Sequence, residues 1–149
     1  NEFRLSKNGK GYLTNIEPLT QYRGMVLWFF NRVNWEYFDP DKVTGVLQQN
    51  QTFIWQNLLR AGDTWLEFKP FCQALKISLN LDRFYEREEH DPDFMLYLNI
   101  RYGMLKHLIL FGCIEIETKE GDTSRQSEIV KFRSTNLGLY MYKAGLEPF

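Results

Sequence analysis

The residues of this sequence that could do chemistry are amide, imidazole and cationic side chains on one helix-like stretch and on the polar segment after it. Between residues 96 and 112 the chain carries two cations and no acid. Such side chains hydrogen-bond to phosphate oxygens and to the edges of bases. The candidate nucleic-acid-binding residues are Asn99, Arg101, Lys106 and His107 on the stretch 96–111, and Lys119 and Arg125 on the polar segment.

The charge balance argues for weak nucleic-acid affinity. Around the polar segment the acids Glu115, Glu117, Glu120, Asp122 and Glu128 outnumber the cations Lys119, Arg125, Lys131 and Arg133. The whole chain has a formal net charge of -1 and a pI near 6.2. Because neutralisation of phosphate supplies most of the affinity of a DNA-binding protein, binding requires that these acids face away from the duplex.

The sequence offers little support for catalysis. It contains no Gly-rich phosphate loop, no nucleophile motif and no metalloprotease-type helix with two histidines. The acidic segment 86–93, with His90 among its carboxylates, could in principle hold a divalent cation, but a run of like charges in a loop is usually hydrated. Cys72 and Cys113 read as buried free thiols. We therefore predict no enzyme, no catalytic residue, no metal site and no cofactor.

The elements that position the candidate residues are best defined in the C-terminal third. An apolar helix over 96–111 is expected to stop at Gly112, because glycine reaches the left-handed backbone of a helix stop without a β-carbon penalty. An alternating strand over 113–118 follows, and the polar segment 119–127 separates it from a second strand over 129–133. This pattern predicts an antiparallel hairpin followed by a short closing helix.

Capping boxes predict the helix starts in the rest of the chain. Thr14 with Glu17, and Thr64 with Glu67, each place a hydroxyl residue three positions before an acid. The first box predicts a helix that continues to Val33, with Pro18 in its first turn. The second predicts a helix that carries Trp65 to Leu75, with Pro70 either kinking it or starting a shorter helix. Between them, a helix is expected to start at Asp39-Pro40 and end at Gly62.

The N-terminus matches the far end of the chain. Phe3-Arg4 followed by Ser6 and Gly9 has the same spacing as Phe132-Arg133 followed by Thr135 and Gly138. In both places a strand leads to a hydroxyl residue that can cap the next helix. We therefore expect residues 1–13 to be the last strand and closing turn of a preceding unit in a longer protein. Residues 14–62 then form a helical part and residues 63–149 a second part, packed as one compact domain.

Four short motifs carry a resemblance to a known family. They are Ser6-Lys7-Asn8-Gly9, Asn34-Trp35-Glu36-Tyr37-Phe38-Asp39, Phe111-Gly112-Cys113-Ile114-Glu115 and Thr135-Asn136-Leu137-Gly138. With this order of elements, the chain resembles uncharacterised bacterial proteins with tandem units of the winged helix-turn-helix superfamily. The resemblance implies a mainly α fold with a small antiparallel β-hairpin, of the α+β class, in which a winged-helix-like C-terminal part follows a helical bundle. In that family the helix before the hairpin enters the major groove of DNA.

Two functions stay open on these grounds. One is a DNA-binding module like that of a transcription regulator. The other is a protein-interaction module that contacts a second copy or the N-terminal part of a longer protein; its motivation is the near-neutral charge together with Trp28, Trp35, Trp55 and Trp65. No apolar run is long enough to cross a membrane and no signal peptide is present, so we expect a cytoplasmic protein.

Overall fold

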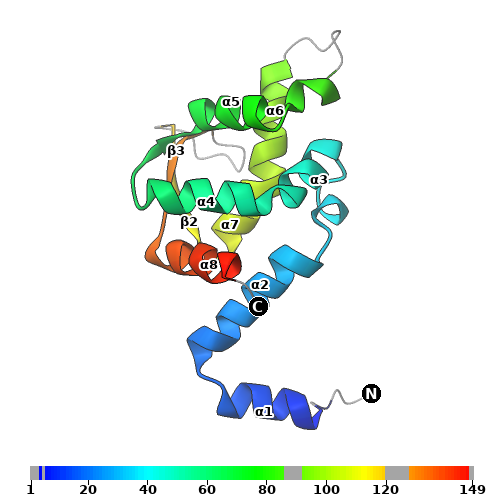
Figure 1. Ribbon diagram of the computed structural model, residues 1–149, viewed down its shortest axis with the longest axis vertical. Coiled ribbons are helices and arrows are strands. Elements are labelled where there is room, and N and C mark those ends of the chain that lie inside the picture. Colours follow the sequence, from blue (N-terminus) through cyan, green and yellow to red (C-terminus); the bar gives the residue numbers. More distant parts are fainter. Residues whose placement is uncertain (1–3, 5, 86–91, 120–127, 148–149) are drawn as a thin grey trace. The chain divides into compact units, whose positions relative to one another are not determined.

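The computed structural model describes residues 4, 6–85, 92–119 and 128–147 of the chain, and it is mainly helical with a small three-stranded antiparallel sheet (Figure 1). The fold class predicted from the sequence is confirmed at this level. The chain divides into two compact units, Asn1–Val33 and Asn34–Phe149. The boundaries expected at residues 13 and 62 stay predictions. No helix in the described ranges is both long enough and apolar enough to span a bilayer.

The first unit contains two helices, α1 (Lys7–Asn15) and α2 (Pro18–Arg32). Ser6 caps α1, because its hydroxyl accepts a hydrogen bond from the amide of Gly9 at 3.1 Å. The turn between the helices is closed by Gln21, whose amide group donates to the carbonyl oxygens of Tyr12 at 2.8 Å and Ile16 at 2.7 Å. The strand expected at Phe3 lies outside the described residues.

The capping box predicted at Thr14 is wrong. Thr14 lies in the last turn of α1 and its hydroxyl donates to the carbonyl oxygen of Lys10 at 2.9 Å. Glu17 is the N-cap of α2, and its carboxylate accepts from the amides of Leu19 and Thr20, both at 2.9 Å. Pro18 explains the shift, because its ring suits the first helical position and it has no amide hydrogen to satisfy.

The second unit begins with a 3-10 turn (Trp35–Tyr37) and two helices, α3 (Lys42–Gln49) and α4 (Gln51–Ala61). The single helix expected from Asp39-Pro40 to Gly62 is wrong in two respects. It starts later, since Asp41 is the N-cap that accepts from the amide of Val43 at 2.7 Å, and it breaks at Asn50. The expected end is confirmed, because Gly62 has a φ of 65°.

The capping box predicted at Thr64 is also wrong. Residues Leu66–Glu67 form strand β1, and helix α5 (Phe68–Ser78) starts only after it. Pro70 therefore lies in the first turn of α5, where its missing amide hydrogen costs nothing. The strand forms because residues 131 and 132, far along the chain, supply its ladder partners, which a local capping signal cannot reveal.

The C-terminal prediction is confirmed. Helix α6 (Pro92–Ile100) continues through a π-helical turn (Arg101–Leu105) into α7 (Lys106–Leu110), and Gly112 follows with a φ of 65°. Strands β2 (Ile114–Thr118) and β3 (Ile129–Ser134) pair antiparallel, and α8 (Asn136–Leu146) closes the chain. The glycine thus converts helix to strand at the expected residue.

The sheet has the order β1-β3-β2, so the last strand in sequence lies in the middle. Phe132 on β3 is fully buried and stands opposite both Leu66 on β1 and Ile116 on β2. Its ring packs edge-on against Phe71 of α5, with centroids 4.9 Å apart. One face of the sheet therefore packs on the helical core, while the alternating residues on its other face carry charge.

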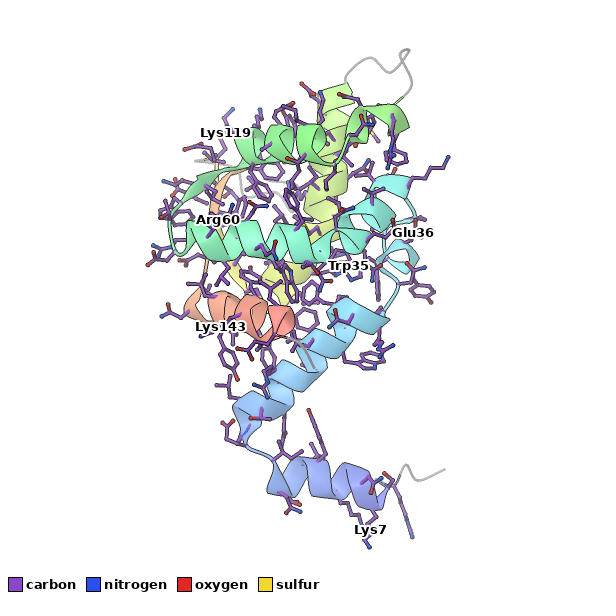
Figure 2. All side chains as sticks on the ribbon, viewed as in Figure 1. Lys7, Trp35, Glu36, Arg60, Lys119 and Lys143 are labelled. Carbon is purple, nitrogen blue, oxygen red and sulfur yellow. The ribbon has the colours of Figure 1, made fainter. Side chains whose placement is uncertain are left out.

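The core of the second unit is built from large side chains. Trp35 is buried among the packed side chains, whereas Arg60, Lys119 and Lys143 lie at the surface (Figure 2). Trp55 of α4 contacts Tyr142 of α8 with ring centroids 5.6 Å apart. Cys72 and Cys113 are buried free thiols, as expected, and burial raises the pKa of Cys113 to about 12.

Candidate functional site

Two of the candidate residues lie inside the protein. Asn99 is buried and its side-chain amide donates to the hydroxyl of Tyr85 at 3.2 Å. His107, expected on the polar side of the long helix, is only 4% exposed and lies against the rings of Trp35 and Phe38, at centroid distances of 5.8 and 5.6 Å. That expectation about His107 is wrong.

His107 follows the fully buried residues Leu96 and Ile100 by eleven and seven positions, and at 3.6 residues per turn these positions share one helical face. The amide of Lys106 donates to the carbonyl oxygen of Arg101, five residues back, where an α-helix would bond four back. With this π-helical turn in place, His107 is still on the buried side of the long helix. His107 consequently faces the core, and its pKa is lowered, first by burial and then by the charge of Lys106, with Asp39 opposing the effect.

The remaining candidates are near the surface but do not form one cluster. Lys106 and Lys119 are exposed, and Arg101 is half-buried with its guanidinium 5.3 Å from the centre of the Tyr102 ring. Arg101 and Lys119 line two neighbouring grooves, and Lys106 lines neither of them. Arg125 lies outside the described residues.

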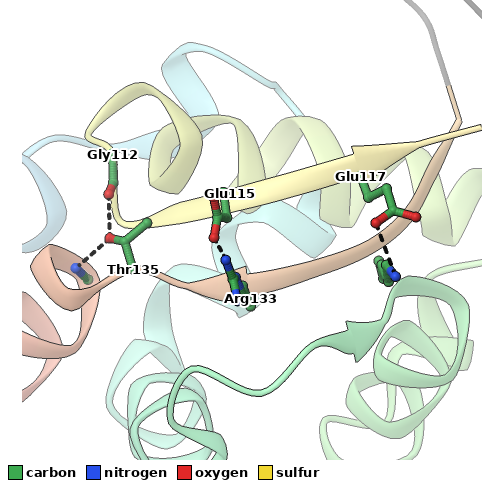
Figure 3. Close-up of polar contacts among 7 residues, drawn as sticks. Gly112, Glu115, Glu117, Arg133 and Thr135 are labelled. Carbon is green, nitrogen blue, oxygen red and sulfur yellow. Dashed lines mark hydrogen bonds and ion pairs between the residues drawn. The ribbon is translucent and has the colours of Figure 1, made fainter.

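The charged face of the sheet is internally neutralised. Arg133 pairs with Glu115, and Lys131 pairs with Glu117 at 3.0 Å, each across the β2–β3 ladder (Figure 3). Both cations also lie over the ring of Trp65, at 4.7 and 5.1 Å from its centre. Two of the acids counted in the sequence, Glu115 and Glu117, are therefore direct partners of the cations on β3.

A groove of about 300 Å³ lies beside helix α6, where the start of α5 and the start of β3 meet it. Its walls are mostly apolar and aromatic: Phe68, Phe94, Tyr97, Leu98 and Ile129. Its charged lining residues are Lys69, Arg101 and Glu128. Phe94, Tyr97 and Leu98 of α6 and Arg101 of the π-helical turn that follows have the spacing of one helical face.

Hydrogen bonds and ion pairs hold this face of α6 against α5. Gln73 of α5 donates to the hydroxyl of Tyr97 at 3.1 Å, and Lys76 pairs with Asp93 at 3.1 Å. The hydrogen bond from Gln73, and next the contact with Lys76, hold the pKa of Asp93 below its usual range. The hydrogen bond to its hydroxyl thus holds Tyr97 in place, so its ring forms a fixed wall of the groove.

Sequence reasoning missed most of the groove. Leu98 belongs to the apolar helix predicted over 96–111, whereas Phe94, which is 54% exposed, lies before the start of that prediction. The sequence signal that points to the groove is the spacing of the apolar residues 94, 97 and 98. The other faces of this helix are also apolar, and a helix at the edge of a domain buries only part of its circumference, so one apolar face must stay exposed. Phe68 and Ile129 join them only through the sheet.

Within the described ranges, no group of three or more His, Cys, Asp or Glu residues is placed to hold a metal ion. Most of the acidic segment in which such a site was considered, residues 86–91, lies outside those ranges. No known protein family, curated protein or solved structure matches the chain. A functional proposal must therefore come from the geometry of the groove and of the surfaces around it.

Proposed function

We propose that residues 51–146 form a winged-helix unit. The order of elements supports this: helix α4, strand β1, helix α5, the long helix α6–α7, then strands β2 and β3. The sheet order β1-β3-β2 supports it further, because β1 joins the hairpin on the side of β3. In this arrangement the long helix is the element that would enter a DNA groove, and the β2–β3 hairpin is the wing.

We propose that this unit binds a protein segment and that it does not act by binding DNA. The observation that carries the proposal is the outward face of α6, where Phe94, Tyr97 and Leu98 accompany a single cation, Arg101. A helix that reads DNA places polar side chains toward base edges and phosphates. Here the polar side chains of Asn99 and His107 are buried instead.

The electrostatics favour the same conclusion. The cations of β3 are engaged by Glu115 and Glu117, and the full chain carries no basic excess. Phosphate binding by the described residues of the long helix and the hairpin would have to break these cross-strand pairs or depend on Arg101, Lys106 and Lys119, which are spread over separate surfaces. An apolar face with a few charges is typical of a site for a protein segment.

A titration of labelled random-sequence duplex DNA with the chain tests this proposal. At about 50 mM salt, where non-specific DNA affinity is strong, we expect no saturable change in fluorescence anisotropy up to tens of micromolar protein. The matched control is the double variant Glu115→Gln and Glu117→Gln, which removes two acids beside Lys131 and Arg133 and should bind the duplex more tightly than the wild type. Wild-type binding that weakens with salt and with Lys106→Ala would overturn the proposal.

DNA binding is the second candidate, and one specific observation favours it. The long helix that precedes the hairpin carries no acid between residues 96 and 112, and Lys106 and Lys119 are exposed. This function requires that Lys106→Ala and Lys119→Ala each reduce affinity for all sequences to a similar extent, and that each reduces the salt dependence. The titration above separates the two functions directly.

A further inference from the structure

We propose that the first unit of the chain docks on the surface of an anionic lipid bilayer. Trp28 and Met25 of α2 enter the interfacial layer, and Lys7, Lys10 and Arg32 supply the charge that attracts the acidic headgroups. The unit lies on the membrane and does not cross it. This inference goes beyond the proposed function, because it concerns residues 4–33 and makes no use of the winged-helix unit.

The charge of the chain is divided unequally between its two units. Residues 1–33 contain five Lys or Arg residues and two Asp or Glu residues, a balance of +3. Residues 34–149 have a balance of -4, which gives the net charge of -1 for the whole chain. An anionic surface therefore attracts the first unit and repels the second.

Three cations of the first unit are not engaged by other protein groups. Lys7, Lys10 and Arg32 are exposed, and their side chains form no ion pair or hydrogen bond with any residue that the structure describes. Lys7 extends outward from α1 (Figure 2). The described acid of this unit, Glu17, uses both carboxylate oxygens to accept from backbone amides at the start of α2. The positive charge of the three cations is thus not compensated within the unit.

One face of α2 exposes large apolar side chains next to one of these cations. Trp28 is 62% exposed and Met25 is 49% exposed. Together with Arg32 they have the spacing of one helical face, and the buried residues Val26 and Phe30 lie on the opposite side of the helix. A helix face that is apolar at its centre and basic at its end is typical of helices that lie in a membrane interface.

Helix α1 adds a second aromatic ring to this face. The hydroxyl of Tyr12 donates to the carbonyl oxygen of Gln21 at 2.6 Å, and the side-chain amide of Gln21 donates to the carbonyl oxygen of Tyr12 at 2.8 Å. A β-carbon on Gly24 would lie 3.2 Å from the same hydroxyl. Gln21 and Gly24 lie one turn before Met25 and Trp28, so Tyr12 is held beside the exposed face. Trp and Tyr are the residues enriched where membranes meet water.

The combination of features favours a lipid surface over other anionic partners. A nucleic-acid duplex offers phosphates but no apolar layer for Trp28 and Met25. An acidic protein has to match the convex surface of a helix in shape, whereas a fluid bilayer adapts to it. A second copy of this unit would bring two positive charges together. A bilayer with acidic headgroups supplies both the negative charge and the apolar layer.

The expected affinity is modest and depends on two signals. Each Lys or Arg near an anionic leaflet raises the affinity by roughly fivefold, so three of them raise it by about a hundredfold. Insertion of a small apolar face alone gives only weak, reversible binding. Binding should therefore require acidic lipid together with the exposed face of α2, and it should weaken as salt screens the charges.

Co-sedimentation of the full chain with large unilamellar vesicles tests the inference. At about 50 mM salt we expect binding to phosphatidylcholine vesicles that contain about 30% phosphatidylserine, at least about tenfold tighter than to phosphatidylcholine alone. The double variant Lys7→Glu and Lys10→Glu should weaken this binding by about twentyfold or more. The matched control is Lys119→Glu with Lys143→Glu, two exposed positions of the second unit. It changes the net charge equally and should lower the affinity by less than about threefold.

Quenching by lipids that carry bromine on their acyl chains locates the inserted residue. Trp35 and Trp55 are buried, whereas Trp28 is largely exposed. We expect such vesicles to quench the fluorescence of the wild type, and Trp28→Leu to remove most of the quenching while binding persists. Trp28→Asp should weaken binding by about tenfold. Met25→Asp is the second variant if Trp28→Asp fails to fold, which circular dichroism checks.

Four outcomes with vesicles would overturn this inference. They are no binding to acidic vesicles at low salt, equal binding to acidic and neutral vesicles, an equal loss in the two double variants, and binding without quenching by brominated lipid. Each of them leaves the proposed function intact. Failure of the proposed function has a separate signature, which is duplex DNA binding that weakens with Lys106→Ala.

Three further results would assign this face to another partner and so exclude the lipid surface. Self-association in sedimentation velocity that is lost in Trp28→Asp would indicate a second copy. Soluble polyglutamate that binds as tightly as acidic vesicles would indicate an acidic protein. Duplex DNA that binds the wild type but not the variant Lys7→Glu and Lys10→Glu would indicate a nucleic acid.

Discussion

The hydroxyl of Thr135 donates a hydrogen bond to the carbonyl oxygen of Gly112 at 2.6 Å (Figure 3). The hydroxyl oxygen of Thr135 in turn accepts from the amide of Gly138 at 3.0 Å, which caps helix α8. The backbone amide of Thr135 also donates to the carbonyl oxygen of Cys113 at 3.0 Å. One residue thus joins the helix-to-strand turn after α7 to the start of α8, and several expected effects of substitution follow from this junction.

Thr135→Val should destabilise the fold by about 1–2 kcal/mol, because valine matches threonine in shape but neither caps α8 nor bonds Gly112. Thr135→Ser should cost clearly less, since serine retains both hydrogen bonds. Urea unfolding followed by circular dichroism gives the two free energies. Equal stability of the Val and Ser variants would contradict the role assigned to the hydroxyl.

Gly138→Ala should be more damaging than an ordinary substitution in a helix. A β-carbon at this position would lie 1.9 Å from the carbonyl oxygen of Cys113, a backbone atom that cannot rotate away. We expect a loss of about 2 kcal/mol or more in the free energy of unfolding. Gly11→Ala in α1 is the control, because its new β-carbon would meet only Asn15, at 3.8 Å, and the better helix propensity of alanine should stabilise slightly. A neutral Gly138→Ala would show that the two segments are less closely packed.

Gly103→Ala tests the contact between the π-helical turn and α3. The added β-carbon would lie 2.3 Å from the hydroxyl of Thr44, which donates to Asp39 at 2.9 Å. We expect a destabilisation of about 1–3 kcal/mol. Removing the hydroxyl with Thr44→Ala should recover part of that loss in the double variant, and a double-mutant cycle measures the coupling. Strict additivity of the two single effects would exclude the contact.

The burial of His107 should make stability depend on pH. Its pKa is lowered in the folded protein, so between that value and the ordinary histidine pKa of about 6.5 the unfolded chain binds a proton that the folded chain does not. The stabilisation is complete above about pH 6.5 and is lost as the pH falls through the folded-state pKa. Urea unfolding at a series of pH values should show a shallower decline for His107→Gln. If the wild type and His107→Gln lose stability with the same slope, other titratable groups cause the decline.

The ion pairs on the sheet should contribute little to stability. Glu115 and Glu117 are exposed partners of Arg133 and Lys131, and water screens such pairs. Glu115→Gln or Glu117→Gln should change the free energy of unfolding by less than about 1 kcal/mol, and by less still at high salt. Thermal unfolding at low and high salt measures this. A large, salt-independent loss would mean that the pairs are desolvated.

Local signals in the sequence were sufficient for the C-terminal part of the fold. Gly112 allows a left-handed turn whatever surrounds it, and the alternation in residues 113–118 and 129–133 marks strands with one buried face. Thr135 and Ser6 each precede a glycine at capping distance, and both cap their helices in the structure. These signals act over a few residues, so a single sequence contains them completely.

Other local signals were misleading because a distant partner competed with them. Thr64 and Glu67 have the spacing of a capping box, but the chain from Leu66 to Glu67 gains a ladder with Phe132 and Lys131 and becomes a strand. The candidate groove depends on the same long-range event, since Ile129 and Phe68 meet α6 only when β3 and α5 are in place.

By itself the sequence determined that Gly112 ends a helix ahead of a strand, that Ser6 and Thr135 cap helices, and that the chain has a nearly neutral charge. Only the tertiary structure decided which side chains of the long helix face outward, because the helix is apolar on several faces and packing leaves Phe94 exposed while it buries Asn99 and His107. It also decided that Glu115 and Glu117 pair with the cations of β3. The physical reason is the same in both cases: the facing of a side chain depends on backbone bonds and strand register that involve residues outside its local segment.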